Sequence, residues 1–334
     1  PDFEAMVKRS RGVADGMSKG IQFLFKKNKV ESILGFGKLV GKNSVEVTDE
    51  SGNKSTYTAK HIILATGARS RELPNLPIDG KKIIGYRKAL ALEKQHESMV
   101  VVGSGAIGSE FAYFYQSIGT DVTLVEFMPT LVPNEDEEVA KQLERSFKKM
   151  KMKIFTSSSV EKVDTSGEKC KVAIKTKKGE EVVEADIVLS AVGISPNTEG
   201  IGLEEMGVVT DNGRVKVNEF YKTNVEGIYA IGDIIAGPAV AHVASAEGII
   251  CVEKIAGLNP EPINYGNIPG CTYTNPEVSS VGLTEAKAKE AGYEIKVGKF
   301  PYSASGKASA AGQKDGFVKL IFDAKYGELL GEIG

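Results

Sequence analysis

The stretch from residue 100 to 110 joins an unbroken apolar run to a helical pattern through three closely spaced glycines. Gly103, Gly105 and Gly108 have the spacing Gly-x-Gly-x-x-Gly, directly after a predicted strand over 99–102. This order is typical of a strand that leads through a tight turn into a helix, with the helix packed closely on the strand. The chain is therefore predicted to contain an α/β unit with a buried parallel sheet.

Each glycine of this turn has its own physical role. Gly103 permits the tight turn, Gly105 lets a pyrophosphate approach the backbone, and Gly108 allows the helix to pack closely on the strand. The start of the helix, predicted over 107–118, adds unpaired N–H groups and the positive end of a dipole. A chance glycine-rich turn is the alternative, but the strand and the helix around it favour a dinucleotide site.

An acidic residue follows at the distance typical of such sites. Glu126 ends the next predicted strand, about 20 residues beyond the turn. A carboxylate there can accept hydrogen bonds from both ribose hydroxyls and repels a 2′-phosphate. No Arg stands among Phe127, Met128 and Pro129, so NAD is predicted over NADP.

Three further polar residues have both a structural and a functional interpretation. Glu110 either favours the dipole of the first helical turn or faces the nicotinamide. Asp233, after a buried strand, either caps the next helix or binds a ribose or ribitol hydroxyl at the carboxyl end of a strand. His242 is interpreted as a packed or capping residue rather than as a base.

An internal repeat places the Gly-rich turn in the second of two similar units. Residues 45–67 and 172–193 each show a strand, a polar hairpin turn, a second strand and an apolar strand that ends in glycine. The Gly-rich turn opens the second unit, whereas the first unit has an end and no such opening. Two related dinucleotide domains are predicted, the first without its N-terminal βαβ segment.

The remaining patterns predict elements on both sides of these units. An amphipathic helix is predicted over 12–30, with Ile21, Leu24 and Phe25 on one face. Short strands are predicted at 30–34, 37–40, 44–48 and 56–58. Past residue 266 a strand, a turn and a helix precede strands of an antiparallel sheet. The predicted domain limits are 1–92 with 216–265, then 93–215, then 266–334.

Composition excludes several classes of function. Lys and Arg number 42 and Asp and Glu number 44, so the net charge of −2 indicates neither nucleic acid nor an anionic membrane as partner. No apolar run has the length of a membrane span. Cys170, Cys251 and Cys271 lie far apart without metal-ligand spacing, so we predict structural thiols in a reducing compartment and no metal site.

Together these motifs resemble the flavin-dependent pyridine nucleotide-disulfide oxidoreductases, and within that family the dihydrolipoamide dehydrogenases. The resemblance covers the whole chain. It rests on the segments KGIQFLFKKNKV, ILATGA, VVVGSGAIGSEFA, TNVEGIYAIGDIIAGPAVAHVASAEG and YTNPEVSSVG. It implies an α/β fold with two Rossmann-like domains, for FAD and for NAD, followed by part of an α+β dimerisation domain.

The resemblance also implies roles for individual residues. The implied NAD-binding residues are Gly103, Ser104, Gly105, Ala106, Ile107, Gly108, Glu110, Glu126, Val160 and Gly193. The implied FAD-binding residues are Gly37, Thr66, Gly67, Ala68, Gly232, Asp233, Ala239, Val240, Ala241 and His242. Glu110 is implied to support the flavin–nicotinamide contact, and no residue of the chain is implied to be catalytic.

Three motifs of the family do not occur in these residues: its N-terminal GxGxxG, its redox CxxxxC and its C-terminal HPxxxE. The resemblance therefore implies a fragment, lacking both chain ends, of an enzyme that oxidises dihydrolipoamide through a disulfide, FAD and NAD⁺. The fragment itself is expected to be inactive. A soluble transhydrogenase, a mercuric reductase and a non-catalytic nucleotide-binding or assembly protein stay open as alternatives.

The implied partners are a second copy of the chain and the lipoyl domains of 2-oxoacid dehydrogenase or glycine cleavage complexes. The expected location is the cytoplasm, or the mitochondrial matrix in a eukaryote.

Overall fold

The computed structural model describes residues 1–334, which form two compact units. Unit 1 comprises residues 1–11, 70–193 and 266–334, and unit 2 comprises residues 12–69 and 194–265. Helix α1 (Phe3–Lys27) begins in unit 1 and continues into unit 2. The expected domain limits at residues 92 and 215 do not coincide with limits of the units, and they stay a prediction.

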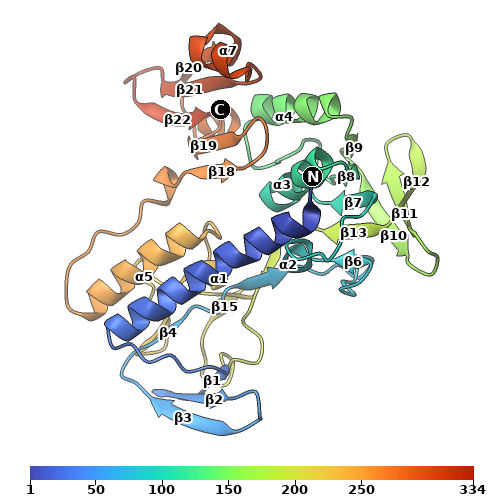
Figure 1. Cartoon of the computed structure of the whole chain (residues 1–334). Helices are drawn as coiled ribbons and strands as arrows, with labels where there is room; N and C mark the ends of the chain where they lie inside the picture. The colour runs from blue at the N-terminus through green and yellow to red at the C-terminus, as the bar shows by residue number, and fades with distance from the viewer. The chain divides into compact units, whose positions relative to one another are not determined.

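A five-stranded parallel sheet in the order β6-β13-β7-β8-β9 forms the centre of unit 1 (Figure 1). Its strands are β6 (Ile83–Ile84), β13 (Ile187–Ser190), β7 (Ser98–Val102), β8 (Asp121–Val125) and β9 (Lys153–Phe155). All of β13 and all but the first residue of β7 are buried, as their apolar runs predict. Helices α3 (Ala106–Ser117) and α4 (Glu137–Lys149) make the connections that follow β7 and β8.

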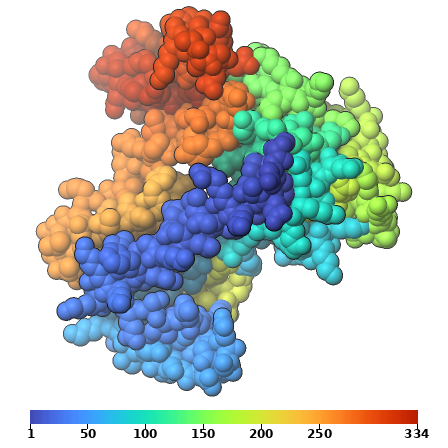
Figure 2. Space-filling model, viewed as in Figure 1, coloured from blue at the N-terminus to red at the C-terminus, as the bar shows by residue number.

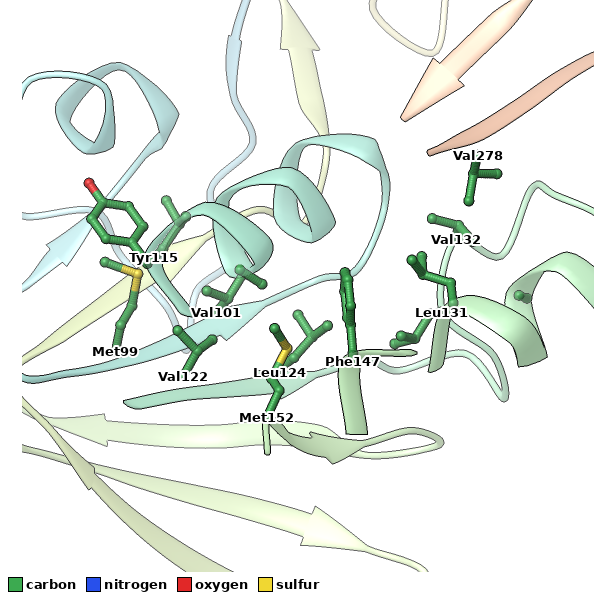
Figure 3. Close-up of a cluster of buried hydrophobic side chains, with 14 of the residues drawn as sticks. Met99, Val101, Tyr115, Val122, Leu124, Leu131, Val132, Phe147, Met152 and Val278 are labelled. Carbon is green, nitrogen blue, oxygen red and sulfur yellow. The ribbon is translucent and has the colours of Figure 1, made fainter. Parts of the chain in front are cut away.

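The hydrophobic core of unit 1 lies between this sheet and its helices (Figure 3). Val101 and Leu124 on the strands belong to one cluster with Tyr115 on α3 and Phe147 on α4. Each such side chain contributes about 1.5–3 kcal/mol when it is fully buried. The cluster extends to Val278 in the C-terminal sheet, so the nucleotide turn and that sheet share one core.

Each unit also contains a three-stranded antiparallel meander. The meanders are β10 (Ser159–Asp164), β11 (Cys170–Thr176) and β12 (Gly179–Ala185) in unit 1, and β1 (Phe36–Gly41), β2 (Ser44–Thr48) and β3 (Lys54–Thr58) in unit 2. After its meander, unit 1 continues into β13, and unit 2 continues into β4 (Ile62–Leu64), which pairs in parallel with β17 (Ile228–Ala230). The repeat predicted from residues 45–67 and 172–193 is thus confirmed as one order of strands.

The C-terminal part of unit 1 is an antiparallel sheet in the order β18-β19-β22-β21-β20, as predicted. Its strands are β18 (Gly270–Thr272), β19 (Val278–Gly282), β20 (Ile295–Pro301), β21 (Phe317–Asp323) and β22 (Leu329–Ile333). The predicted helix is α6 (Glu285–Glu290), whereas α7 (Gly306–Ala311) was not predicted. Helix α7 consists mostly of Gly, Ala and Ser without an apolar period, and Ser305 Oγ caps it by accepting from Ala308 N.

The remaining elements are short or connect the sheets. They are α2 (Tyr86–Ala89), α5 (Ala241–Ile255), β5 (Ala68–Ser70), β14 (Ile194–Pro196), β15 (Thr210–Asp211), β16 (Arg214–Val215), and the 3₁₀ turns η1 (Gly232–Ile234), η2 (Tyr265–Asn267) and η3 (Tyr302–Ala304). None of the helices combines the length and the apolar character that crossing a membrane requires.

Helix α1 begins earlier than the predicted residue 12. Asp2 Oδ1 accepts a hydrogen bond from Ala5 N at 2.9 Å, and Glu4 lies in the first turn. Both features stabilise a helix start near Phe3. The apolar period used for the prediction marks only the later part of the helix.

The predicted apolar face of α1 is not buried. Ile21 and Leu24 are each 52% exposed and Phe25 is 41% exposed, and Figure 2 shows the dark blue helix uncovered on the visible face. The prediction of a strand over 30–34 was wrong, because this segment pairs with no strand. β-branched and apolar residues favour a strand only where a partner supplies hydrogen bonds.

Candidate nucleotide-binding sites

The Gly-rich turn, residues 103–108, lies at the carboxyl edge of the parallel sheet of unit 1. Gly103 N donates to Val125 O at 2.8 Å, and Ala191 N donates to Val102 O at 2.8 Å, so the ends of β13, β7 and β8 lie side by side. Gly105 is the N-cap residue of α3, and no side chain caps this helix. An open helix N-terminus at the carboxyl ends of parallel strands can bind phosphate groups.

The three glycines have different surroundings. A Cβ on Gly108 would lie 1.9 Å from Gly103 O, and a Cβ on Gly103 would lie 2.4 Å from Ala191 O. Gly103 also has φ +96°, in the left-handed region. A Cβ on Gly105 would meet no atom within 4 Å. The packing of the protein itself therefore requires Gly103 and Gly108, whereas the space over Gly105 is free and fits a phosphate group.

Glu126 lies directly after β8 and is bonded to the Gly-rich turn. Its side chain is 6% exposed. Its Oε2 accepts hydrogen bonds from Ser104 N and Ser104 Oγ, both at 2.7 Å, and its Oε1 accepts one from Met128 N at 2.7 Å. These charge-assisted bonds fix the carboxylate beside the turn. Because each carboxylate oxygen has two lone pairs, Glu126 can still accept a hydrogen bond from a ribose hydroxyl.

The other predicted NAD residues belong to strands around this edge. Val160 on β10 is buried, and its backbone oxygen accepts a hydrogen bond from Asn75 Nδ2 at 2.5 Å. Gly193 follows β13 with φ +108° and open space at its Cβ position. Ser190 was not predicted: it pairs with Val102 in the sheet, and its buried Oγ has no hydrogen-bond partner. Such an unpaired polar group is unusual in a folded protein.

Glu110 lies on α3 beyond its first turn, which contains no acidic residue. The interpretation of Glu110 as a first-turn acid is therefore wrong. Its Oε1 accepts a hydrogen bond from Tyr273 N at 2.8 Å. Glu110 lines a mostly apolar cavity of about 490 Å³, together with aromatic residues that include Phe111 and Phe114.

In unit 2, the parallel strands β4 and β17 end at one edge. Ile231 N donates to Leu64 O at 3.0 Å, which extends the pairing past the strand ends. Residues 66–68 follow β4 and residues 232–233 follow β17. The structure therefore brings these two segments, predicted from distant parts of the sequence to bind FAD, to the same edge.

Asn197, which was not predicted, holds the segment 66–68 in place. Asn197 N donates to Gly67 O at 2.9 Å, and Asn197 Nδ2 donates to Thr66 O at 3.0 Å. Thr66 Oγ1 donates to Asn197 O at 2.6 Å. Gly67 has φ +69° and open space at its Cβ position, whereas Ala68 is buried. The backbone at Gly67 is thus fixed while one side of it stays open to a ligand.

Asp233 belongs to the 3₁₀ turn η1 and does not cap a helix. The N-cap residue of α5 is Val240, so the interpretation of Asp233 as the cap is wrong. Gly232, with φ +72°, donates its N–H to Glu247 Oε2 at 2.6 Å. Asp233 is half-buried, and its carboxylate takes part in none of the side-chain hydrogen bonds or ion pairs of unit 2. It is therefore available to a ligand hydroxyl.

Residues 239–242 lead into α5 and are all exposed. No side chain caps the N-terminus of α5, so its first N–H groups are free to meet a ligand. His242 is exposed, so the interpretation of His242 as a packed residue is wrong. Gly37 lies on β1 opposite Val47 of β2, and none of the hydrogen bonds joins Gly37 to the edge formed by β4 and β17.

Comparison with known proteins identifies the family of the chain. The model of the pyridine nucleotide-disulphide oxidoreductases matches residues 2–248, and the model of the dimerisation domain of these proteins matches residues 268–332. The chain belongs to the pyridine nucleotide-disulphide oxidoreductase family. The predicted α/β fold class, with dinucleotide-binding domains followed by a dimerisation domain, is confirmed for this oxidoreductase.

Several relatives of this oxidoreductase are similar over nearly all of its length. A dihydrolipoyl dehydrogenase of Rhizobium etli is 50% identical over 99% of the chain and 72% of its own length. A dihydrolipoyl dehydrogenase of Zymomonas mobilis is 44% identical over the same shares of the two chains. The crystal structure of LpdA from Mycobacterium tuberculosis has a TM-score of 0.91 at 27% identity, and the match covers 99% of this chain and 73% of that one.

The cofactors of this oxidoreductase family are FAD and NAD, and the residues described above fit parts of both. In unit 1 the free space over Gly105 and the uncapped start of α3 fit the pyrophosphate of NAD. In unit 2 the available carboxylate of Asp233 and the open side of Gly67 fit a polyhydroxyl chain such as the ribityl group of FAD. A Gly-x-Gly-x-x-Gly turn occurs only in unit 1.

Proposed function

We propose that the chain forms the nucleotide-binding parts of a dihydrolipoyl dehydrogenase, which transfers electrons from dihydrolipoamide through FAD to NAD⁺. The observation that carries the proposal is the Gly-rich turn, with free space over Gly105 and the fixed carboxylate of Glu126 beside it. The dihydrolipoyl dehydrogenases that are 50% and 44% identical to the chain support this substrate.

In this proposal unit 1 binds NAD. The N–H groups of residues 105–108 bind the pyrophosphate, and Glu126 accepts a hydrogen bond from the adenosine ribose. Three hydrogen bonds hold the Glu126 carboxylate in place, so it cannot turn away from a 2′-phosphate. The repulsion between these negative groups selects NAD over NADP. Val160 and Gly193 complete the site, and Glu110 is the supporting acid near the nicotinamide.

Unit 2 binds FAD through residues 66–68, 232–233 and 239–242, with Gly37 as a further contact. Asp233 accepts a hydrogen bond from the ribityl chain, and the N-terminus of α5 presents N–H groups to the flavin ring. FAD, when bound, supplies the hydride chemistry, and the protein supplies position and electrostatics.

The dihydrolipoamide step requires a redox disulfide, and Cys170, Cys251 and Cys271 are all free thiols. The proposed partners are a second copy of the chain, bound through residues 268–332, and the lipoyl domains of a 2-oxoacid dehydrogenase or glycine cleavage complex. The match to a dimerisation domain supports the homodimer. The free thiols support a reducing compartment, the cytoplasm or the mitochondrial matrix.

The test compares the 334-residue chain with the gene product, including any residues that precede or follow it. Dihydrolipoamide-dependent reduction of NAD⁺ is expected from the gene product, and none is expected from the 334-residue chain, which has no redox disulfide. The chain itself is expected to bind NADH at least tenfold more tightly than NADPH, as measured by nicotinamide fluorescence, an effect of about 1.4 kcal/mol. Equal affinities would contradict the role of Glu126, and a gene product inactive with dihydrolipoamide would contradict the proposed substrate.

A further inference from the structure

A buried carboxylate lies behind the turn at Gly232 in unit 2. Glu247 on α5 is 1% exposed and takes part in none of the ion pairs of the unit. Its Oε2 accepts a hydrogen bond from Gly232 N at 2.6 Å, and its Oε1 accepts one from Tyr265 Oη at 2.8 Å. A buried charge without a counter-ion is costly, so a fold keeps it only where its hydrogen bonds are satisfied.

Tyr265 connects Glu247 with two further parts of unit 2. A Cβ on Gly237 would lie 3.3 Å from the ring of Tyr265, so the ring packs against the loop between Asp233 and α5. The hydroxyl oxygens of Tyr265 and Tyr221 are 3.3 Å apart. Burial, together with hydrogen bonds to Tyr221 and Glu247, raises the pKa of Tyr265 well above its ordinary value. Tyr265 therefore stays a neutral donor toward the carboxylate.

Tyr221 ties this network to the end of strand β17. Its side chain is buried, and its backbone oxygen accepts a hydrogen bond from Ala230 N at 3.0 Å. Gly232 follows Ala230 closely and has φ +72°, and a Cβ on Gly232 would lie 3.2 Å from Ala244 Cβ of α5. The backbone of this turn is thus held from the strand on one side and from the helix on the other.

We propose that Glu247 is the positioning residue of the flavin-binding turn, acting through Gly232 N–H and through the hydroxyl of Tyr265. By holding the Gly232 N–H it sets the direction of the following residue, Asp233, toward the ribityl chain. Through Tyr265 it also supports the loop that leads to His242. This inference rests on the proposed function, which assigns the turn to FAD.

Four variants separate positioning from general loss of stability. Glu247→Ala removes the acceptor of Gly232 N–H. Glu247→Gln keeps that acceptor, because its amide can donate to the Tyr265 oxygen, whose hydroxyl then donates to Tyr221. Tyr265→Phe removes only one hydroxyl. Its matched control is Tyr115→Phe in unit 1, which removes a buried hydroxyl that donates to Ala89 O at 2.7 Å.

Two measurements follow each variant. Hydrogen–deuterium exchange of residues 230–242 is measured in the 334-residue chain without flavin, and the FAD dissociation constant is measured in the gene product by flavin fluorescence. With Glu247→Ala, both the exchange rate and the dissociation constant are expected to rise about tenfold, the effect of one unsatisfied buried donor. Tyr265→Phe is expected to cause a smaller rise in both, and Glu247→Gln and Tyr115→Phe are expected to cause none.

Each alternative outcome has a distinct meaning. Unchanged exchange at residues 230–242 in Glu247→Ala, or an equal rise in Tyr115→Phe, overturns the proposal. Faster exchange with an unchanged FAD dissociation constant overturns the role toward flavin. A wild-type gene product that binds no FAD contradicts the proposed function, and the exchange measurement then still decides whether Glu247 holds the turn.

Discussion

Gly105 and Gly108 are both glycines of one turn, yet the space around their Cβ positions differs: it is empty at Gly105 and filled at Gly108. The sequence motif predicts both positions, but it does not tell which glycine the protein requires for its own packing. That difference depends on Gly103 O, which lies against Gly108, and on the empty space over Gly105. Only coordinates reveal it, because the neighbours of each Cβ position are set by how the turn folds between the strands.

Alanine at these two positions is expected to give separate results. Gly108→Ala would place Cβ 1.9 Å from Gly103 O, and the resulting overpacking is expected to lower the free energy of unfolding by about 1–3 kcal/mol or more. Gly105→Ala is expected to leave that energy unchanged and to weaken NADH binding at least tenfold, about 1.4 kcal/mol. Thermal unfolding and NADH titration measure the two effects. Intact NADH binding in Gly105→Ala would show that the pyrophosphate lies elsewhere.

The polar residues that support the sites were harder to predict than the glycines. Asn197, Ser190 and Glu247 lie outside the recognised spacings. The partner of Asn197 is the distant Thr66, the partners of Glu247 lie in other elements, and the buried Oγ of Ser190 has no hydrogen-bond partner. A buried Glu on an apolar helix such as α5 is a signal that could have identified Glu247, because an unpaired buried carboxylate requires donors. No comparable signal points to Ser190 or Asn197.

At the scale of elements, a buried ion cluster joins two helices to the C-terminal sheet within unit 1. Lys319 on β21 has a side chain that is 1% exposed. Its Nζ lies 3.0 Å from Asp136 at the N-cap of α4, 3.0 Å from Glu138 in that helix and 2.7 Å from Glu285 of α6. The cluster therefore links the nucleotide-binding part of unit 1 to its C-terminal sheet.

Lys319→Met is expected to destabilise unit 1 strongly. The substitution leaves the buried carboxylate of Asp136 without its cation, which costs about 3–5 kcal/mol of unfolding free energy. The matched control is Lys141→Met, because the pair of Lys141 with Glu137 is exposed and is expected to contribute less than about 1 kcal/mol. Urea unfolding measures both variants. A similar small loss in the two variants would contradict the importance of the cluster.

The same cluster predicts how stability depends on pH. Hydrogen bonds from Lys289 and Lys319 lower the pKa of Glu285 from 4.5 to about 2, so its contribution is present above pH 4.5 and is lost as the pH falls toward 2. Burial lowers the pKa of Lys319, but hydrogen bonds to Glu285, Asp136 and Glu138 raise it by more. The net pKa therefore lies above the ordinary 10.5. Its contribution is present below pH 10.5 and is lost as the pH rises through the raised pKa.

Unfolding free energies measured from acidic to basic pH test the lowered pKa of Glu285 and the raised pKa of Lys319. The contribution of the cluster is expected to stay constant between its acidic and basic limits and to fall on either side. In Lys319→Met both slopes are expected to be smaller than in the wild-type chain. Identical pH profiles for the two proteins would show that the cluster does not cause the loss of stability at low and high pH.

Which elements could be predicted depended on where their hydrogen bonds are made. Helix α3 and strands β7 and β8 lie close to their predicted positions, because each has a strong apolar period and a clear end. The strand expected at 30–34 has a suitable composition but no partner strand. Helix α7 lacks an apolar period and depends on its cap at Ser305, which the sequence pattern did not indicate.

At the scale of the whole molecule, the repeat was the most informative signal. It predicted two hairpins, each followed by a buried strand that ends in glycine, from residues 45–67 and 172–193 alone, and it correctly implied related units. It did not predict that β4 pairs with β17, because strand pairing across such a distance leaves no local pattern. The family resemblance assigned residues 66–68 and 232–233 to the same cofactor, but only the structure showed that they lie at one edge.

The thiols of the chain give a prediction for the molecule as a whole. Cys271 is exposed, whereas Cys170 and Cys251 are buried, and burial raises the pKa of Cys251 to about 11. Since the thiolate is the reactive form, a thiol reagent is expected to modify Cys271 rapidly and the other two slowly. In denaturant all three are expected to react. Fewer than three reactive thiols after unfolding would reveal a disulfide within or between chains.

The pairing of β4 with β17 also sets the order in which the molecule can be assembled during synthesis. The central sheet of unit 1 is encoded continuously from β6 to β13, so it can form as soon as residue 190 has left the ribosome. Strand β4 emerges earlier, but its partner is made only after that sheet. Until β17 is made, the apolar edge of β4 has no hydrogen-bond partners, and such an edge favours aggregation. We therefore expect nascent chains that stop before Ile228 to depend on chaperones far more than the finished protein does.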